Sequence, residues 1–182
     1  MPVDEALRRE LLTMEAEDRR LRQVLLDAGE LHGDPPAYHP RMRELHQRSN
    51  ARLWEILDDY ETWPGRRLVG DDGAGAAWLI AQHALLDPEL QRRCLEMLEI
   101  AVDCGDAEPA HYAYLLDRVR MADGRDQVYG TQFVDSDDGR TVAPWPIEDR
   151  AGVDERRAKV GLPPVAEHTR LMQEHYEKER TP

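Results

Sequence analysis

Apolar residues recur every three to four positions along the first 60 residues, the period of a helix with one buried face. Between residues 4 and 28 this stripe consists of Leu7, Leu11, Met14, Leu21, Leu25 and Ala28, with Asp18 as its one polar member. A breaker rich in glycine and proline follows at residues 29–40, and a second apolar stripe runs over residues 42–60. The pattern predicts two helices joined by a short connection, and therefore an antiparallel helical hairpin.

The chain beyond residue 62 carries the pattern of a larger helical body. Further helices are predicted over residues 73–86, 88–103, 109–122, 149–160 and 164–179. The first of these is rich in alanine and glycine, which permit close approach of neighbouring helices, so we place it at the centre of the body. The last is polar on almost every side, and we expect it to be a tail.

One short segment departs from the helical period. Residues 127–134 are rich in β-branched and aromatic side chains, residues 135–139 form a polar turn, and residues 140–142 can return. This order predicts a small β-hairpin or an ordered loop.

The fold class expected from these patterns is mainly α. Its parts are an N-terminal antiparallel helical hairpin (residues 1–62), a packed helical domain with a small β-hairpin (residues 63–162), and a polar C-terminal helix (residues 163–182).

Charge and cysteine content limit the function classes. The 182 residues carry a formal net charge of −13, and an acidic surface repels phosphate, so neither nucleic acid nor an anionic membrane is an expected partner. Cys94 and Cys104 lie ten residues apart on one predicted helix, about 15 Å along its axis, which is too far for a disulfide. Because no leader precedes Asp4 and no apolar stretch is long enough to cross a membrane, we expect a cytoplasmic location.

Several short motifs between residues 63 and 162 carry a family resemblance. The matching positions are Trp63, Gly65, Trp78, Gln82, His83, Asp117, Arg118, Tyr129, Gly130, Thr131 and Gln132. Their order (Trp-x-Gly, Gln-His-Ala, Asp-Arg, Tyr-Gly-Thr-Gln) resembles an uncharacterised bacterial domain family of unknown function. The resemblance implies a family label and no activity, and it leaves residues 1–62 and the C-terminal helix outside.

The same motifs supply the candidate site. In the catalytic interpretation, His83 is a general acid or base, Asp117 orients it, and Arg118 binds an anionic group of the substrate. The residues expected to bind substrate are Gln82, Gln127, Tyr129, Thr131 and Gln132. In the structural interpretation, His83 and Asp117 are a satisfied core pair and Arg118 fixes the hairpin to the helices. A third interpretation is a binding pocket without catalysis.

Other chemistry finds weaker support in the residues. No serine or cysteine lies in a nucleophile motif. His32, His39 and His46 are separated by prolines, so no helix face unites them, and we expect neither a metal nor another cofactor.

Two functions therefore stand side by side. The first is an enzyme acting on a small polar or anionic substrate by histidine-centred acid–base chemistry. The alternative is a protein-binding module of the immunity or adapter type, with a protein partner or self-association through residues 4–60.

Overall fold

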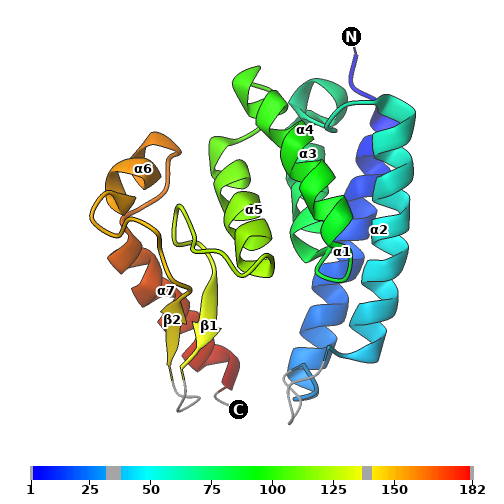
Figure 1. Cartoon of the computed structure of the whole chain (residues 1–182). Coiled ribbons are helices and arrows are strands. Elements are labelled where there is room, and N and C mark those ends of the chain that lie inside the picture. The colour runs from blue at the N-terminus through cyan, green and yellow to red at the C-terminus, as the bar shows by residue number, and fades with distance from the viewer. Residues whose placement is uncertain (1, 32–37, 137–140, 181–182) are drawn as a thin grey trace. The chain divides into compact units, whose positions relative to one another are not determined.

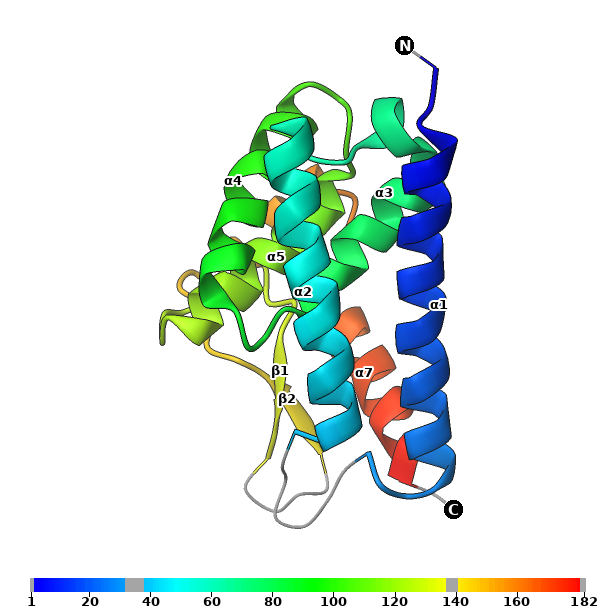
Figure 2. The same ribbon diagram turned by 90° about the vertical axis from the view of Figure 1, so that its right-hand side faces the viewer.

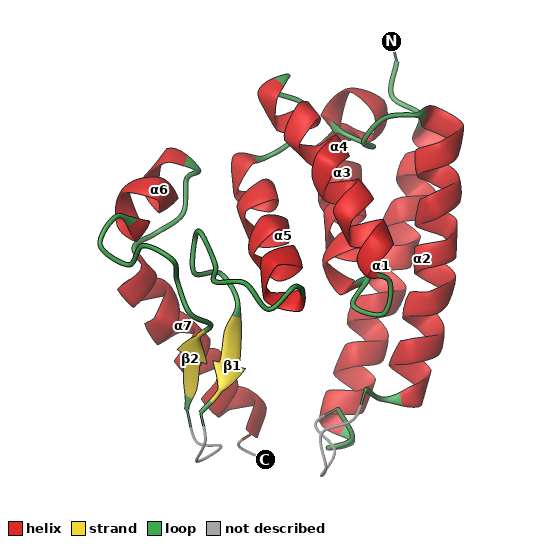
Figure 3. Ribbon diagram, in the orientation of Figure 1, coloured by secondary structure: helices red, strands yellow, loops and turns green. Residues whose placement is uncertain are grey.

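The computed structural model describes residues 2–31, 38–136 and 141–180, and side chains up to residue 178. The chain is mainly α-helical with one small antiparallel sheet, which confirms the predicted fold class (Figures 1 and 3). It forms two compact units, residues 1–107 (unit 1) and residues 108–182 (unit 2). Residues 63–107 thus share a unit with the N-terminal hairpin, whereas the sequence grouped them with the chain that follows.

The described residues of unit 1 form the helices α1 (Glu5–Asp27), α2 (Pro40–Tyr60), α3 (Arg66–His83) and α4 (Pro88–Asp103). The first two lie side by side and antiparallel, as the stripes predict (Figure 2). Asp4 caps α1 by accepting hydrogen bonds from the backbone N–H groups of Ala6 and Leu7. The apolar stripes bury Leu11, Leu25 and Leu53 completely, while Leu21 is half-buried. This burial is the main stabilisation of the unit.

Helix α3 begins earlier than its alanine-rich pattern predicts. The pattern starts at Gly73, but the helix starts at Arg66 and contains a kink at Gly70, where φ is 74° and ψ is 171°. A residue with a side chain rarely adopts that conformation. Beyond the kink, Ala76, Ala77 and Ala81 are fully buried, and α3 packs against α1. The predicted central position of this helix is therefore observed within unit 1.

Unit 2 contains α5 (Pro109–Ala122), β1 (Phe133–Asp135), β2 (Val142–Pro144), α6 (Val153–Lys159) and α7 (Val165–Arg180). The two strands pair antiparallel, with Val134 opposite Ala143. The predicted hairpin is present, but it is shorter than expected, since residues 127–132 form a loop instead of a strand. Most of the predicted turn at residues 135–139 lies outside the described residues.

Helix α7 packs on the sheet and on α6, so the expectation of a free tail is wrong. The backbone N–H of Val142 donates to the side-chain oxygen of Gln173 at 2.9 Å. His168 is buried, and its Nδ1 lies 2.8 Å from the guanidinium of Arg157, which is fully buried.

Within the described ranges, no helix is both long and apolar enough for a membrane span.

Candidate functional site

Three polar side chains meet inside unit 1, each from a different helix. Asp18 belongs to α1, His46 to α2, and His83 is the last residue of α3. His46 Nε2 lies 2.5 Å from Asp18 Oδ1, and His83 Nδ1 lies 3.0 Å from Asp18 Oδ2. One ligand-type atom from each of the three residues can be chosen so that all lie within 4.8 Å of one another. We call these three residues the Asp18 centre.

The Asp18 centre is buried on one side and open on the other. Asp18 and His46 are each 6% exposed, whereas the side chain of His83 is 31% exposed. Burial raises the pKa of Asp18, but the contacts with His46 and His83 outweigh it, and the pKa lies well below its usual range. The centre therefore holds a buried carboxylate anion, and each of its two oxygens contacts one imidazole ring.

A small cavity adjoins the Asp18 centre. Its walls are formed by Met14, Asp18, His46, Ser49, Asn50, Leu79, Ile80 and His83. Its free volume of about 10 Å³ is the space of roughly one water molecule. The wall thus combines three apolar side chains with five polar ones.

Two polar atoms of this wall lack a hydrogen-bond partner within the described part of the chain. They are the side-chain oxygen of Asn50 and Nδ1 of His83. The second atom lies at ion-pair distance from Asp18 but not in a hydrogen-bonding geometry. Because a buried polar atom without a partner costs about 1–3 kcal/mol, both atoms have hydrogen-bonding capacity available to a polar ligand.

Tyr38 completes the surroundings of His46. Its hydroxyl contacts His46 Nδ1, and the two rings lie 5.7 Å apart. Since Nδ1 faces a hydroxyl and Nε2 faces Asp18, both nitrogens of this imidazole have defined neighbours. The ring orientation of His46 is therefore fixed from two sides.

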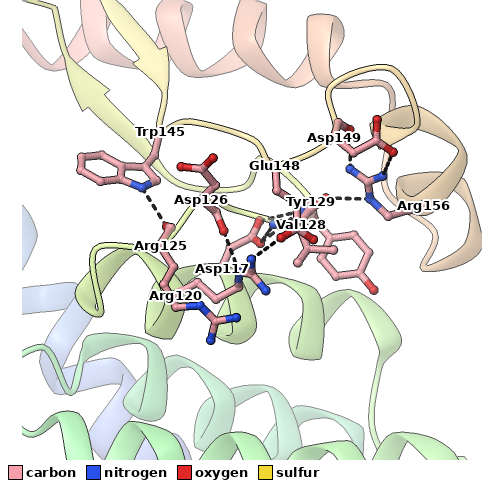
Figure 4. A network of polar contacts seen from close by, with 10 residues as sticks. All are labelled: Asp117, Arg120, Arg125, Asp126, Val128, Tyr129, Trp145, Glu148, Asp149 and Arg156. Carbon is pink, nitrogen blue, oxygen red and sulfur yellow. Dashed lines mark hydrogen bonds and ion pairs between the residues drawn. The ribbon is translucent and has the colours of Figure 1, made fainter.

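Unit 2 contains a separate polar network around Asp117 on α5 (Figure 4). Asp117 is fully buried and accepts hydrogen bonds from the backbone N–H groups of Val128, Tyr129 and Thr131 at 2.8–3.2 Å, and from the Thr131 hydroxyl at 3.0 Å. A carboxylate with that many donors holds a loop in place. Within unit 1 the carboxylate that contacts His83 is Asp18, and the orientation of His83 by Asp117 stays a prediction.

The other candidate residues of unit 2 also bind the loop itself. The side chain of Gln127, fully buried, donates to the carbonyls of Gln132 and Trp145 and accepts from the Gln132 N–H. Gln132 donates to the Tyr114 carbonyl, and Tyr129 contributes its carbonyl to Arg157. These amide groups replace the strand ladder that the sequence predicts for residues 127–132.

Salt bridges brace the rim of this network (Figure 4). Arg156 donates to the Val128 carbonyl at 2.9 Å and pairs with Asp149 at 2.7 Å, while Arg120 pairs with Glu148. Burial raises the pKa of Tyr129, so its phenol stays protonated. Unit 2 is thus a braced scaffold around a buried carboxylate.

Gln82 and Arg118, two further residues of the predicted site, belong to different units. Gln82 lies on α3 in unit 1 and is buried, with its carbonyl 3.3 Å from the Gln91 amide nitrogen. Arg118 lies on α5 in unit 2 and is partly buried. Of the predicted catalytic residues, only His83 lies in the Asp18 centre, and the substrate-binding roles of the others stay predictions.

Asp18, His46 and Asn50 are the residues that the sequence analysis did not select. The signal was present, since Asp18 interrupts an apolar stripe, and His46 and Asn50 follow Met42 at intervals of four on the buried face of α2. What the pattern lacks is any sign that these positions meet in space.

Comparison with known protein families extends the resemblance to nearly the whole chain. Residues 5–180 match a family of unknown function, DUF6624. The chain belongs to this family. The match includes the N-terminal hairpin and the C-terminal helix, so the limits of 63–162 expected from the motifs were too narrow. No curated protein and no solved structure matches the chain significantly. Membership of DUF6624 therefore assigns no activity.

Proposed function

We propose that this DUF6624 protein is an enzyme that acts on a small polar substrate and that its reaction centre is the Asp18 centre. The observation that supports the proposal is the cavity wall, where a buried carboxylate and two imidazoles adjoin two unsatisfied polar atoms. Protein interiors satisfy nearly all of their buried polar groups, and exceptions concentrate at functional sites.

A purely structural role accounts less well for this arrangement. A structural polar cluster is expected to satisfy its members, as the Asp117 network does in unit 2. In the Asp18 centre, by contrast, Asn50 and His83 each keep a buried atom without a hydrogen bond in the described structure. The centre thus keeps unused hydrogen-bonding capacity for a ligand.

The size and exposure of the site favour a small substrate. The cavity itself admits about one water molecule, and His83 is the member of the centre that reaches the surface. A substrate would therefore approach at His83 and present one polar group to the cavity. Carboxylate and imidazole side chains are suited to hold or activate water for attack on such a group.

The protein-binding alternative has less support from unit 1. The stripe on residues 4–60 that suggested a docking surface buries Leu7, Leu11 and Leu25 inside the unit.

For the cellular location, the free thiols of Cys94 and Cys104 support our expectation of the reducing cytoplasm.

The test is a ligand screen followed by turnover. The purified protein is screened by thermal shift against polar metabolites, and the hits, together with simple esters, amides and phosphate esters, are assayed for conversion by NMR. We expect His83→Ala and Asp18→Asn to abolish conversion. The matched control His175→Ala, on the exposed face of α7, and Arg118→Ala are expected to retain it.

Two outcomes would overturn the proposal. One is wild-type conversion by both His83→Ala and Asp18→Asn. The other is loss of conversion in Arg118→Ala alone, which would return the reaction to the residues predicted from the motifs.

A further inference from the structure

We infer that the Asp18 centre binds one divalent transition-metal ion and that Asn50 holds a water molecule on that ion. The inference deepens the proposed function by naming its cofactor, and it rests on that function only for the claim that the reaction takes place on the metal.

The three side chains have the composition of a metal site. Two imidazole nitrogens and a carboxylate oxygen are ligands that zinc and related ions prefer, and three protein ligands leave a position for water. The contacts of 2.5 and 3.0 Å are shorter than the separation of about 3.3 Å between two ligands of one tetrahedral zinc ion. An ion would widen both contacts by less than about 1 Å, which small side-chain rotations can provide.

The direction of the atoms favours an ion over a direct contact. His83 Nδ1 lies 3.0 Å from Asp18 Oδ2 but has no hydrogen-bonding geometry to any described residue, so the contact leaves this nitrogen incompletely satisfied. A metal ion placed among the three atoms would use both groups. On the far side of His46, the Tyr38 hydroxyl is placed to accept the Nδ1 proton, the outer contact that metal-binding histidines commonly make.

Charge supports the same conclusion. With neutral imidazoles, the centre carries one negative charge, and a divalent ion changes this to one positive charge. A hydroxide ion or an anionic substrate group would restore neutrality. The site therefore suits a reaction in which a negatively charged oxygen is held on the metal.

Asn50 is the independent sign of the water molecule. It lies one helical turn after His46 on the same face of α2, is 5% exposed and lines the cavity. Its side-chain oxygen can accept but lacks a donor in the described structure, and the cavity has room for about one water. A water on the metal would supply that donor.

The chemistry that follows is hydrolysis. The bound water gives one proton to solvent, and its oxygen uses a lone pair to bond to the electrophilic carbon or phosphorus of the substrate. The bond to the leaving group then breaks, and the leaving group departs with the electron pair and takes up a proton. No oxidant or further reactant is needed.

The first test measures metal binding without reference to activity. Full-length protein is stripped with a chelator and titrated with Zn²⁺ by calorimetry and with Co²⁺ by visible absorption. We expect one ion per chain and a tetrahedral Co²⁺ spectrum. Asp18→Asn and His46→Gln are expected to lose more affinity than the roughly 10- to 100-fold typical of an outer-shell change, while His175→Gln keeps wild-type affinity. Ca²⁺ serves as the control for non-specific attraction to an acidic chain.

The second test isolates Asn50. Asn50→Leu replaces an unsatisfied acceptor with an apolar group of similar size, so the melting temperature of the metal-free protein is expected to stay equal or rise. The Zn²⁺-induced rise in melting temperature is expected to be smaller than in the wild type. A purely structural Asn50 would give the opposite pair of results, namely a lower melting temperature without metal and an unchanged rise with it.

The outcomes separate this inference from the proposed function. Absence of stoichiometric Zn²⁺ binding, or equal affinity in Asp18→Asn, His46→Gln and wild type, overturns the metal site even if His83→Ala abolishes turnover. Metal binding with full turnover in the stripped protein overturns the metal as cofactor and leaves the reaction centre standing. Circular dichroism of each variant shows that the lost affinity does not reflect lost folding.

Discussion

Buried polar residues in this protein fall into two groups that differ in how they are satisfied. The side chains of Asp117 and Gln127 form hydrogen bonds with backbone groups of the loop at residues 127–132 and its neighbour Trp145. These bonds fix the path of the backbone. Asn50 and His83 each have a buried atom beside a cavity that forms no hydrogen bond with any residue the structure describes. In the first group, side-chain hydrogen bonds take the place of the backbone hydrogen bonds of a sheet. The second group has the hydrogen-bonding capacity expected of a ligand site.

The Asp117 network leads to a stability prediction. Asp117→Ala leaves three backbone N–H groups without their acceptor, and we expect a loss of about 3 kcal/mol or more in the free energy of unfolding. Asp117→Asn is expected to destabilise nearly as much, because the NH₂ group of asparagine would face backbone N–H groups, and two donors cannot form a hydrogen bond with each other. Urea unfolding checks both, with exposed Asp126→Asn as the control, expected within about 0.5 kcal/mol of wild type. Wild-type stability of Asp117→Asn would contradict the structural role.

The candidate site was only partly predictable from its residues. His83 could be selected because it is a polar residue in an apolar helix, and Asp18 could be noticed for the same reason. Their meeting depends on the packing of α1 against α3, which joins positions 65 residues apart, and helical periodicity carries no information about that distance. The sequence analysis named Asp117 as the partner because it belongs to one of the motifs that carry the family resemblance.

At the scale of elements, periodicity performed well for helices and poorly for the loop. Each predicted helix is present, and the helices of residues 1–122 are the ones whose apolar faces are long enough to define a period of 3.6 residues. Residues 127–132 are rich in strand formers but pair with side chains, because Asp117 and Gln127 offer acceptors and donors at the spacing of the backbone. The β-propensity of a segment indicates that its side chains suit a sheet. It does not indicate which hydrogen-bond partners lie near the backbone in the folded chain.

The kink in α3 gives a prediction with an internal control. Gly70 has a positive φ of 74°, so Gly70→Ala is expected to destabilise by about 1–3 kcal/mol. Gly75 lies in the regular part of the same helix and has open space where a Cβ would be placed, so Gly75→Ala is expected to stabilise by about 0.5–1 kcal/mol. Thermal and urea unfolding measure both. Equal effects of the two substitutions would contradict the kink.

The packing of α7 is expected to depend on pH through His168. Burial, together with the neighbouring charge of Arg157, lowers the pKa of His168 to about 4, from 6.5 in an unfolded chain. Above pH 6.5 both states are neutral and the contribution to stability is complete. Between pH 6.5 and 4 only the unfolded chain takes up the proton, so stability is lost as the pH falls, by up to about 3 kcal/mol.

His168→Gln tests this dependence, since glutamine can still accept a hydrogen bond from Arg157 but does not titrate. The difference in unfolding free energy between wild type and variant is measured in urea from pH 8 to pH 4. Groups that titrate in both proteins cancel in that difference. We expect it to shrink or change sign toward pH 4, and a constant difference would refute the role of His168.

At the scale of the whole molecule, the chain combines two compact units and a net charge of −13. Unit 1 contains the cavity and the ligand-type cluster, whereas unit 2 contains a buried network that is satisfied internally. The acidic surface attracts divalent cations in general. Binding of a divalent ion alone therefore does not show a specific site. A specific site is recognised by the residues that the bound ion stabilises.

Hydrogen exchange in the full-length protein locates that action. A ligand stabilises the elements that it joins, and Zn²⁺ at the Asp18 centre would join α1, α2 and α3. We expect Zn²⁺ to slow amide exchange around residues 14–22, 42–50 and 76–83 and to leave residues 127–132 unchanged. In Asp18→Asn the effect should vanish, and Ca²⁺ should not reproduce it. Equal protection of both units would mean that they open as one cooperative body, and protection by Ca²⁺ equal to that by Zn²⁺ would mean that charge alone binds the ion. Either result would remove the basis for assigning separate tasks to the two units.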